Sequence, residues 1–352
     1  MIKVAVVILN WNGRGMMERF LPSVMEHSLS DDKLAVSVIV ADNGSTDGSV
    51  EFLSEHYPAI SVIQLDKNYG FAEGYNRALE QLNTEHLTLN TPFDYYVLLN
   101  SDVECTPHWI QPVADMMEKD DKVAIAQPKL LMYDQKDTFE YAGGAGGFID
   151  CYGYPFCRGR LFSTVETDNG QYDDECNIFW ATGAAMFVKA PVFHELGGLD
   201  GDFFAHMEEI DFCWRAQNNG YIVRYCPDSV LYHVGGGTLP KSSPFKTRLN
   251  FRNNLSMLYK NLPDNRLKKV LRRRMLLDGV AAVKFLLQGH SGEFKAVCEA
   301  HKEYRALRPQ LQEKRAALKQ SAVAGVYQRL LLRDYYVCRC KTFSSLKGDF
   351  SK

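Results

Sequence analysis

The sequence predicts an α/β fold in which helices flank a mainly parallel, mixed β-sheet. Up to about residue 125, short apolar runs rich in β-branched residues alternate with helical stretches, which is the pattern of consecutive βαβ units. Polar segments rich in Asn, Asp and Gly follow four of these apolar runs. Because ligands of such sheets bind beyond the carboxyl ends of the strands, we expect a site at this edge.

The expected elements follow one another along the chain. The strands are VAVVIL (4–9), LAVSVIV (34–40), ISVIQL (60–65) and DYYVLLN (94–100), and helices run to about residue 27, over 49–56 and over 71–82. The strand ends carry NWNG (10–13), ADNGS (41–45), DKNYG (66–70) and NSD (100–102). Residues 130–180 are rich in Gly and Tyr and predict loops and short strands. Ordered elements return over 180–240, and from about residue 244 to the end the pattern is helical and basic.

The charge is divided unevenly along the chain. The formal net charge is −3, but residues 1–240 hold 15 Lys and Arg against 35 Asp and Glu, a net of −20, whereas residues 241–352 hold 25 against 8, a net of +17. An asymmetry of this size suggests that the two parts meet different partners. We therefore expect a catalytic domain over 1–240 and a helical, basic region over 241–352.

The cysteines and the apolar runs exclude several classes of protein. The nine cysteines are odd in number and lack C-x-x-C spacing, which argues against a disulfide framework or a structural zinc site. The N-terminal MIKVAVVILNW has no cleavage signature of a signal peptide, and no uninterrupted apolar run reaches about 18 residues. We therefore expect a reduced, cytoplasmic protein without a membrane-spanning helix.

Three residues at predicted strand ends have side chains that bind ligands. The carboxylate of Asp42 can accept a hydrogen bond from a nucleobase or ribose, although an Asx turn would also explain it. Asp102 can hold a divalent cation that bridges two phosphates, and His233 can join it as a ligand. A capped turn at Asp102 and a structural histidine are the alternatives.

Two helix starts carry further candidates. NYGFAEGYNRAL brings Gly70, Asn76 and Arg77 to a helix entry, where free backbone N–H groups attract anions, or where the glycine serves only packing. HMEEIDFCWR concentrates three acids beside aromatic residues. Glu208 and Asp211 share a helix face, and Glu209 points about 100° away. Such a carboxylate can act as a general base, although the helix dipole alone also favours acids here.

Taken in order, these segments resemble the inverting glycosyltransferases of family 2, which have the nucleotide-sugar-binding GT-A fold. The matching pieces span roughly residues 3–240 and are most similar to the rhamnosyltransferase-like enzymes that extend bacterial surface polysaccharides. They are VVILNWNG, VIVADNGSTDGS, NYGFAEGYNRAL, YYVLLNSDVE, FWATGAAMFV, GGLDGDFFAHMEEIDFCWR and YHVGGGT.

The resemblance implies roles on the donor side of the site. Asp42 would contact the nucleoside, with Asn10 and Asn12 lining the pocket. Asp102 would be the surviving acid of the D-x-D metal motif, whose first position is Asn100 here. His233 would be the late histidine ligand of the diphosphate or of the metal, Mg²⁺ or Mn²⁺.

The resemblance also implies roles on the acceptor side. Glu209 matches the catalytic base, which is usually Asp in an E-D-x-D pattern, and the choice between Glu209 and Glu208 stays open. Asp211 would support the base. Trp180, Thr182 and Gly183 would line the acceptor site for a saccharide or lipid-linked saccharide.

Two other functions compete with sugar transfer. A nucleotidyltransferase that makes sugar nucleotides also begins with βαβ units, but it needs a Gly-rich, basic loop after the first strand, and NWNGRG matches this poorly. A non-catalytic nucleotide-sugar-binding module is the third candidate. Products separate the first two, because a nucleotidyltransferase releases diphosphate.

The basic C-terminal part has its own interpretation. RLKKVLRRR (266–274) has six basic residues in nine and continues into the apolar MLLDGVAAVKFLLQG. A basic helix joined to an apolar one is typical of contact with an anionic membrane surface, here through residues 264–290. Packing on the catalytic domain or on a second copy is the alternative. No nucleic-acid motif accompanies the basic run, so we do not expect a nucleic-acid partner.

Overall fold

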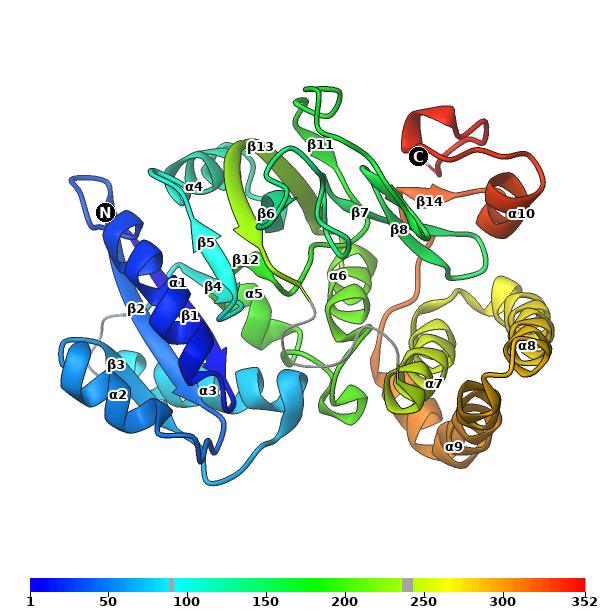
Figure 1. Cartoon of the computed structure of the whole chain (residues 1–352), viewed down its shortest axis with the longest axis horizontal. Helices are drawn as coiled ribbons and strands as arrows, with labels where there is room; N and C mark the ends of the chain where they lie inside the picture. The colour runs from blue at the N-terminus through cyan, green and yellow to red at the C-terminus, as the bar shows by residue number, and fades with distance from the viewer. Residues whose placement is uncertain (89–91, 236–242, 352) are drawn as a thin grey trace.

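The computed structural model describes residues 1–88, 92–235 and 243–351. Within these residues the centre is a nine-stranded sheet with the order β11-β13-β6-β12-β4-β1-β2-β3, and β5 pairs with β13 outside this order (Figure 1). The strands are β1 (Ile2–Asn10), β2 (Leu34–Asp42), β3 (Ser61–Gln64), β4 (Tyr95–Leu99), β5 (Val103–Cys105), β6 (Val123–Met132), β11 (Cys176–Asn177), β12 (Ala185–Lys189) and β13 (Ile222–His233). The helices are α1 (Arg14–His27), α2 (Ser49–His56), α3 (Gly70–Thr88), α4 (Gln111–Glu118), α5 (Ala190–Glu195) and α6 (Glu208–Asn218). The predicted alternation of strands and helices is confirmed.

The central strand β1 contributes to two separate cores, because successive strand side chains point to opposite faces. Val4, Val6 and Ile8 share one core with residues of α1, α2 and α4. Ala5 and Val7 share the other with residues of α3, α5 and α6. Burial on both faces explains why this strand is a continuous apolar run rather than an alternating one.

Strand direction brings the carboxyl ends of several strands to one edge. β1 pairs in parallel with β2 and β4, and β2 with β3. β12 runs antiparallel to both β4 and β6, and β13 runs parallel to β6. β4, β6 and β13 therefore share a direction, so that Asn100, after β4, and His233, at the end of β13, reach the same edge.

A second sheet joins the Gly-rich middle of the chain to its C-terminal part. Its order is β10 (Thr164–Val165), β9 (Arg160–Leu161), β8 (Pro155–Cys157), β7 (Gly147–Asp150) and β14 (Val326–Tyr327). The short strands predicted over 130–180 are therefore present. The prediction that the chain is helical from about residue 244 to the end is wrong beyond Ala317. There the chain forms β14, whose parallel partner β7 supplies the hydrogen bonds, and the short α10 (Leu331–Tyr336).

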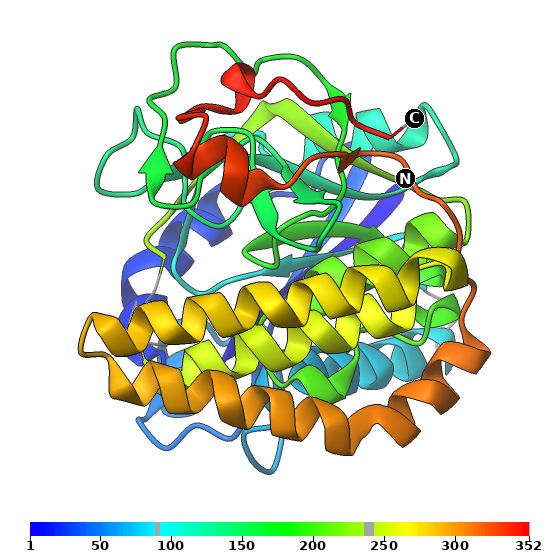
Figure 2. The same cartoon turned by 90° about the vertical axis from the view of Figure 1, so that its right-hand side faces the viewer.

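Three long helices cover one side of the molecule. They are α7 (Pro244–Asn261), α8 (Asp264–Leu287) and α9 (Ser291–Ala317), and they lie beside one another below α10 and β14 (Figure 2). Apolar residues of α7 such as Leu255 and Leu258 belong to the same core as Trp214 of α6. The predicted division at residue 240 falls among 236–242, outside the described residues, and stays a prediction. No helix in the described ranges is long and apolar enough to cross a membrane.

Candidate active site

The first cluster joins the ends of β1 and β2. Because these strands pair in parallel register, Asn10 lies opposite Asp42, and its Nδ2 donates to Asp42 Oδ1 at 3.0 Å. The backbone N–H of Ser45 donates to the other carboxylate oxygen at 2.9 Å. Asn12, at φ 50°, accepts a hydrogen bond from the backbone N–H of Thr46 at 2.8 Å. The structure therefore brings Asn10, Asn12 and Asp42 together, as the sequence predicts.

The second cluster lies where β4, β5 and β13 meet. His233 Nε2 lies 3.1 Å from Asp102 Oδ1 and 3.4 Å from Asn100 Nδ2. On the other side of the ring, Nδ1 lies 3.4 Å from Oε1 of Glu140, an ion-pair contact without hydrogen-bond geometry. Asp102, His233 and Glu140 are all buried. The glycines of YHVGGGT at 236 and 237 lie outside the described residues.

Electrostatics in this cluster favour a cation. Burial lowers the pKa of His233, but the carboxylates of Asp102 and Glu140 outweigh it and raise the pKa to about 10. Burial also raises the pKa of Asp102, yet contact with His233 lowers it overall. Without a metal ion, the two carboxylates therefore favour a protonated imidazole between them, and a divalent cation that His233 ligates would have to displace the Nε2 proton.

The donor set fits a divalent ion that substrate phosphates also ligate. Within the described ranges, no group of three or more His, Cys, Asp or Glu side chains is arranged to hold a metal. Asp102 and His233 offer one carboxylate and one imidazole, and Mg²⁺ or Mn²⁺ often takes only one or two ligands from protein. A carboxylate on the far nitrogen of a ligating histidine, as Glu140 is here, is a usual way to orient the ring. Sequence reasoning missed Glu140, which lies in a loop without any motif.

The start of α3 is occupied by protein groups. The N–H of Phe71 donates to the carbonyl of Phe204 at 2.8 Å, and a Cβ on Gly70 (φ 80°) would lie 2.5 Å from the Phe204 ring. Asn76 donates to the carbonyl of Leu199 and accepts from its N–H. Arg77 pairs with Glu73 at the surface. These contacts are structural, and a role of Gly70, Asn76 and Arg77 in donor binding stays a prediction.

The two glutamates begin α6 in a buried setting. Glu208 is 4% exposed, and one carboxylate oxygen of each glutamate is buried without a hydrogen-bond partner. Burial raises the pKa of Glu208 well above its ordinary value, and the charges of Glu209 and Asp211 raise it further. Burial raises the pKa of Glu209 to about 7, although backbone N–H groups at the start of the helix lower it. Glu209 is therefore the carboxyl group that exchanges a proton near neutral pH.

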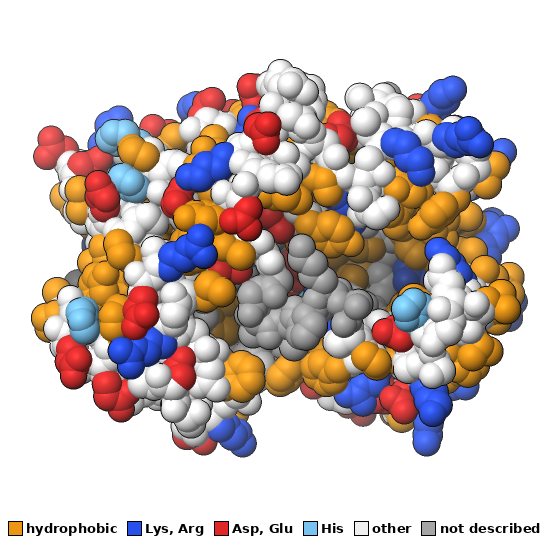
Figure 3. Space-filling view, viewed as in Figure 1, with side chains coloured by type: hydrophobic (Ala, Val, Ile, Leu, Met, Phe, Trp, Pro, Cys, Tyr) orange, Lys and Arg blue, Asp and Glu red, His pale blue; other side chains and the backbone are white. Residues whose placement is uncertain are grey.

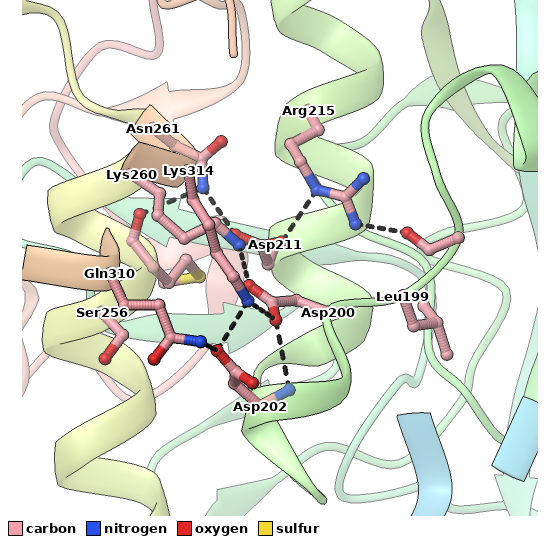
Figure 4. A network of polar contacts seen from close by, with 12 residues as sticks. Leu199, Asp200, Asp202, Asp211, Arg215, Ser256, Lys260, Asn261, Gln310 and Lys314 are labelled. Carbon is pink, nitrogen blue, oxygen red and sulfur yellow. Dashed lines mark hydrogen bonds and ion pairs between the residues drawn. The ribbon is translucent and has the colours of Figure 1, made fainter. Parts of the chain in front are cut away.

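Asp211 belongs to a network of polar contacts with the C-terminal helices (Figure 4). It accepts from Arg215 Nε at 2.9 Å, from Lys260 Nζ at 2.9 Å and from Asn261 Nδ2 at 2.7 Å. Lys260 also contacts Asp200, which Lys314 of α9 contacts at 2.6 Å. The network ties α6 to α7 and α9. The predicted support of the base by Asp211 stays a prediction.

The sequence of α7 carries a signal for its buried polar side chains. Lys260, a member of the network, and Asn253, which lies outside it, come eleven and four positions after the buried Leu249, which puts all three on one helix face. Polar side chains on a buried stripe require partners, since an unpaired buried polar group is costly. The partners themselves are distant in sequence and could not be named from it.

The predicted acceptor residues lie in a buried segment beside α6. Trp180 donates its ring N–H to the carbonyl of Phe148 at 2.9 Å, and the N–H of Thr182 donates to Gln127 Oε1 at 3.0 Å. Gly183 packs against the Phe71 ring, which a Cβ would approach to 2.8 Å. Between them, the N–H of Ala181 contacts Cys213 Sγ of α6 at 3.4 Å. The segment is thus adjacent to the helix that carries both glutamates.

Comparison with known proteins gives a family and a fold. Residues 5–177 match the family model described as glycosyl transferase family 2. The N-acetylglucosaminyl-diphospho-decaprenol L-rhamnosyltransferase of Mycobacterium tuberculosis is 27% identical over 241 residues, which cover 66% of this chain and 76% of that protein.

Two solved structures are similar in fold. S. aureus TarS in complex with UDP-GlcNAc has a TM-score of 0.54 at 14% identity, over 90% of this chain and 88% of that one. GalNAc-T7 with UDP, GalNAc and Mn²⁺ has a TM-score of 0.55 at 14% identity, over 75% of this chain and 49% of that one. The chain thus spans about half the length of GalNAc-T7. The expected GT-A fold is confirmed.

Proposed function

We propose that this chain, whose residues 5–177 match the model of glycosyl transferase family 2, is an inverting, metal-dependent hexosyltransferase of that family. It moves a sugar from a nucleoside-diphosphate sugar to a hydroxyl group of a saccharide or lipid-linked saccharide in the synthesis of a bacterial cell-surface polysaccharide. The observation that carries the proposal is Glu209, which begins α6 with a buried, unpartnered oxygen and a pKa of about 7. Such a carboxyl group suits a general base at neutral pH.

The donor binds at the edge of the sheet where the strands end. Asn10, Asn12 and Asp42 hold the nucleoside, and Asp102 and His233 hold Mg²⁺ or Mn²⁺ beside the diphosphate. When bound, the ion neutralises the negative charge that develops on the leaving diphosphate. Because Asn100 replaces the first acid of the D-x-D motif, the protein would supply one negative charge fewer to a bound ion.

The transfer is a single displacement. Glu209 takes the proton of the acceptor hydroxyl while the hydroxyl oxygen bonds to the anomeric carbon. The bond from that carbon to the diphosphate oxygen breaks on the opposite face, and its electron pair leaves with the nucleoside diphosphate. One displacement inverts the anomeric centre and needs no enzyme nucleophile, unlike the two-carboxylate route of retaining glycosidases. Burial and then the charge of Glu209 raise the pKa of Glu208, which favours its protonated form.

The acceptor lies on the side of α6. Trp180, Thr182 and Gly183 line this side. Their segment lies next to α6, because the N–H of Ala181 contacts Cys213. The relative from M. tuberculosis has a name that includes a diphospho-decaprenol acceptor, which supports a lipid-linked acceptor here. A lipid-linked acceptor requires that the protein work at a membrane surface.

The exposed face of α8 supports peripheral membrane contact through residues 264–290. Its first half exposes Lys268, Lys269, Arg272 and Arg273, and its second half exposes Leu276, Val280, Val283, Leu286 and Leu287. Leu276 is 70% and Leu287 84% exposed, and Tyr336 of α10 lies beside Lys284. Figure 3 shows Lys and Arg side chains among hydrophobic ones along the side where α8 and α10 lie. Basic and apolar residues on one face match an anionic lipid surface at the inner face of the membrane.

A product assay tests the proposed reaction. The protein is incubated with dTDP-, UDP- and GDP-sugars and MnCl₂ or MgCl₂, together with lipid-linked N-acetylglucosamine, and nucleoside diphosphate is measured by chromatography. We expect its release for one donor class, with an inverted linkage by NMR. A second incubation with nucleoside triphosphates and sugar 1-phosphates tests the alternative, because a nucleotidyltransferase would release inorganic diphosphate there. Donor binding without turnover in either incubation would indicate a binding module.

Liposome flotation tests the membrane contact. We expect the full chain to float with phosphatidylglycerol vesicles and not with phosphatidylcholine vesicles. The triple variant Leu276→Ser, Val280→Ser, Val283→Ser should stay at the bottom, whereas Lys295→Gln on exposed α9 should float like the wild type. Flotation of the triple variant would contradict the contact, and a wild-type dimer that this variant makes monomeric would assign the face to a second copy.

A further inference from the structure

The backbone that leads into α6 adopts an unusual conformation. Phe204, His206 and Met207 have φ values of 63°, 70° and 74°, in the left-handed region that side chains other than glycine rarely adopt. Such a backbone conformation is unfavourable and persists only where its surroundings fix it. Glu208 and Glu209 follow directly, so the direction of both carboxyl groups depends on this turn.

Asn253 of α7 fills the inside of the turn. Its side chain is fully buried, and Nδ2 lies within hydrogen-bond distance of three carbonyl oxygens, those of Phe203 at 3.0 Å, Ala205 at 2.9 Å and His206 at 2.8 Å. Two N–H groups shared among three carbonyls leave no freedom for the amide to rotate. The acceptor oxygen of Asn253 is held in turn by Nε of Arg252 at 2.8 Å.

Arg252 connects the turn to the residues before it and to α9. Its Nη2 donates to the carbonyls of Asp202 at 3.0 Å and Phe203 at 3.2 Å. Its Nη1 pairs with Glu303 of α9 at 3.5 Å. The turn is therefore fixed through its backbone carbonyls, by a pair of residues from the C-terminal helices.

We propose that Asn253, oriented by Arg252, is a positioning residue that holds the Phe203–Met207 turn in the form that presents Glu208 and Glu209 to the acceptor. The inference rests on the proposed function for its catalytic consequence only. The turn also contacts the start of α3, because the Phe204 carbonyl accepts the N–H of Phe71. One buried amide thus fixes the segment that leads into the two glutamates.

Hydrogen exchange measured by mass spectrometry tests the hold without any assay of activity. In Asn253→Ala, backbone amides over 203–211 should exchange about tenfold faster or more, because hydrogen bonds that fix the turn are lost. Asn250→Ala is the matched control, since Asn250 lies one turn earlier and donates only to Lys246 of its own helix. Unchanged exchange in Asn253→Ala would overturn the proposal.

A second substitution separates donation from packing. Asn253→Asp keeps the shape but aims a carboxylate oxygen at the three carbonyls. If Asn253 acts by donating, the exchange should be at least as fast as in Asn253→Ala. A milder effect than in Asn253→Ala would mean that the side chain only fills space, and the proposal would fail. If either variant does not fold, Arg252→Gln, at a half-buried position, should show the same local exchange with a smaller increase, and its absence would count against the hold.

The catalytic consequence has its own readout. With dTDP or UDP and MnCl₂ as probes, calorimetry should give the same Kd for Asn253→Ala as for the wild type, because the strand ends are untouched. The kcat of the transferase assay should fall at least ~10-fold with the KM for the donor unchanged. If the wild type has no transferase activity, the proposed function is refuted. The hydrogen-exchange result then still tests whether Asn253 fixes the turn. Normal kcat in a variant with fast exchange would refute the positioning role.

Discussion

The ammonium group of Lys260 lies 2.9 Å from the carboxylate of Asp211, and neither side chain reaches solvent, with exposures of 2% and 0%. Asp211 belongs to the helix that begins with the two glutamates, and Lys260 to the helix that begins at Pro244. The pair therefore joins the catalytic segment to the C-terminal helices by charge rather than by apolar packing alone. Because both charges are buried, removing one leaves the other with fewer partners than its burial requires; without Lys260, Asp211 would keep the contacts of Arg215 and Asn261.

Lys260→Met should consequently destabilise the protein strongly. The side chain keeps its length, but Asp200 and Asp211 lose their shared cation, for an expected loss of about 3–5 kcal/mol in the free energy of unfolding. Lys314→Met removes a cation that is 31% exposed and should cost about 1 kcal/mol or less. Urea denaturation followed by tryptophan fluorescence measures both, and equal losses would contradict the burial argument.

Glu209→Gln should separate donor binding from turnover. The amide keeps the shape of the side chain but cannot take a proton, so kcat should fall at least ~100-fold while the Kd for the nucleoside diphosphate stays the same. Glu208→Gln, which replaces a group that keeps its proton, should retain most of the activity. Steady-state rates and calorimetry check both; normal turnover in Glu209→Gln would move the role of base to Glu208 or Asp211.

The raised pKa of Glu208 predicts a dependence of stability on pH. Below its ordinary pKa of 4.5, Glu208 is protonated in the folded and the unfolded chain. As pH rises above this value the unfolded chain releases the proton first, so the folded state loses stability by about 1.4 kcal/mol per pH unit until Glu208 itself ionises. Glu208→Gln does not titrate, and its Tm should exceed that of the wild type near pH 7 and match it near pH 4. An equal Tm at both values would refute the buried, protonated state.

Asp102→Ala should remove the effect of metal on nucleotide binding. Titration of dTDP or UDP in the presence of MnCl₂ should show a Kd raised about 100-fold, because the only carboxylate that touches His233 Nε2 among the described contacts is lost. Asp42→Ala is the comparison, since it should weaken nucleotide binding equally with and without metal. An unchanged titration of Asp102→Ala would refute the metal site.

The pattern of the chain predicted the elements that local sequence controls. The helix from Ser49 to His56 matches the expected range, because its apolar residues recur at helical spacing and Gly48 precedes it in a left-handed conformation. Asp42 and Asp102 were expected at one edge of the sheet, because each follows a predicted strand and parallel strands share one carboxyl edge. That His233 joins Asp102 was expected from its place after a strand, and the family resemblance implied the same.

What the pattern could not supply is contact over long sequence separation. Asn253 and Glu140 carry no local signal of their partners, since a buried hydrogen bond depends on which elements pack together. The strand at Val326–Tyr327 is too short for any period of two to stand out, and it forms only because β7 offers a free edge. The basic run of 266–274 correctly indicated a helix. Which of its side chains are buried depends on the neighbouring helices and could not be predicted from the run itself.

The pairing of β14 with β7 has a consequence for synthesis of the protein. Chains emerge from the ribosome N-terminus first, at about 5–20 residues per second. The β7 edge near Asp150 is therefore made many seconds before its partner at Tyr327 exists. During that interval an exposed strand edge is open to other chains. The nascent protein thus passes through a stage at which association with a chaperone, or with another copy, competes with its own completion.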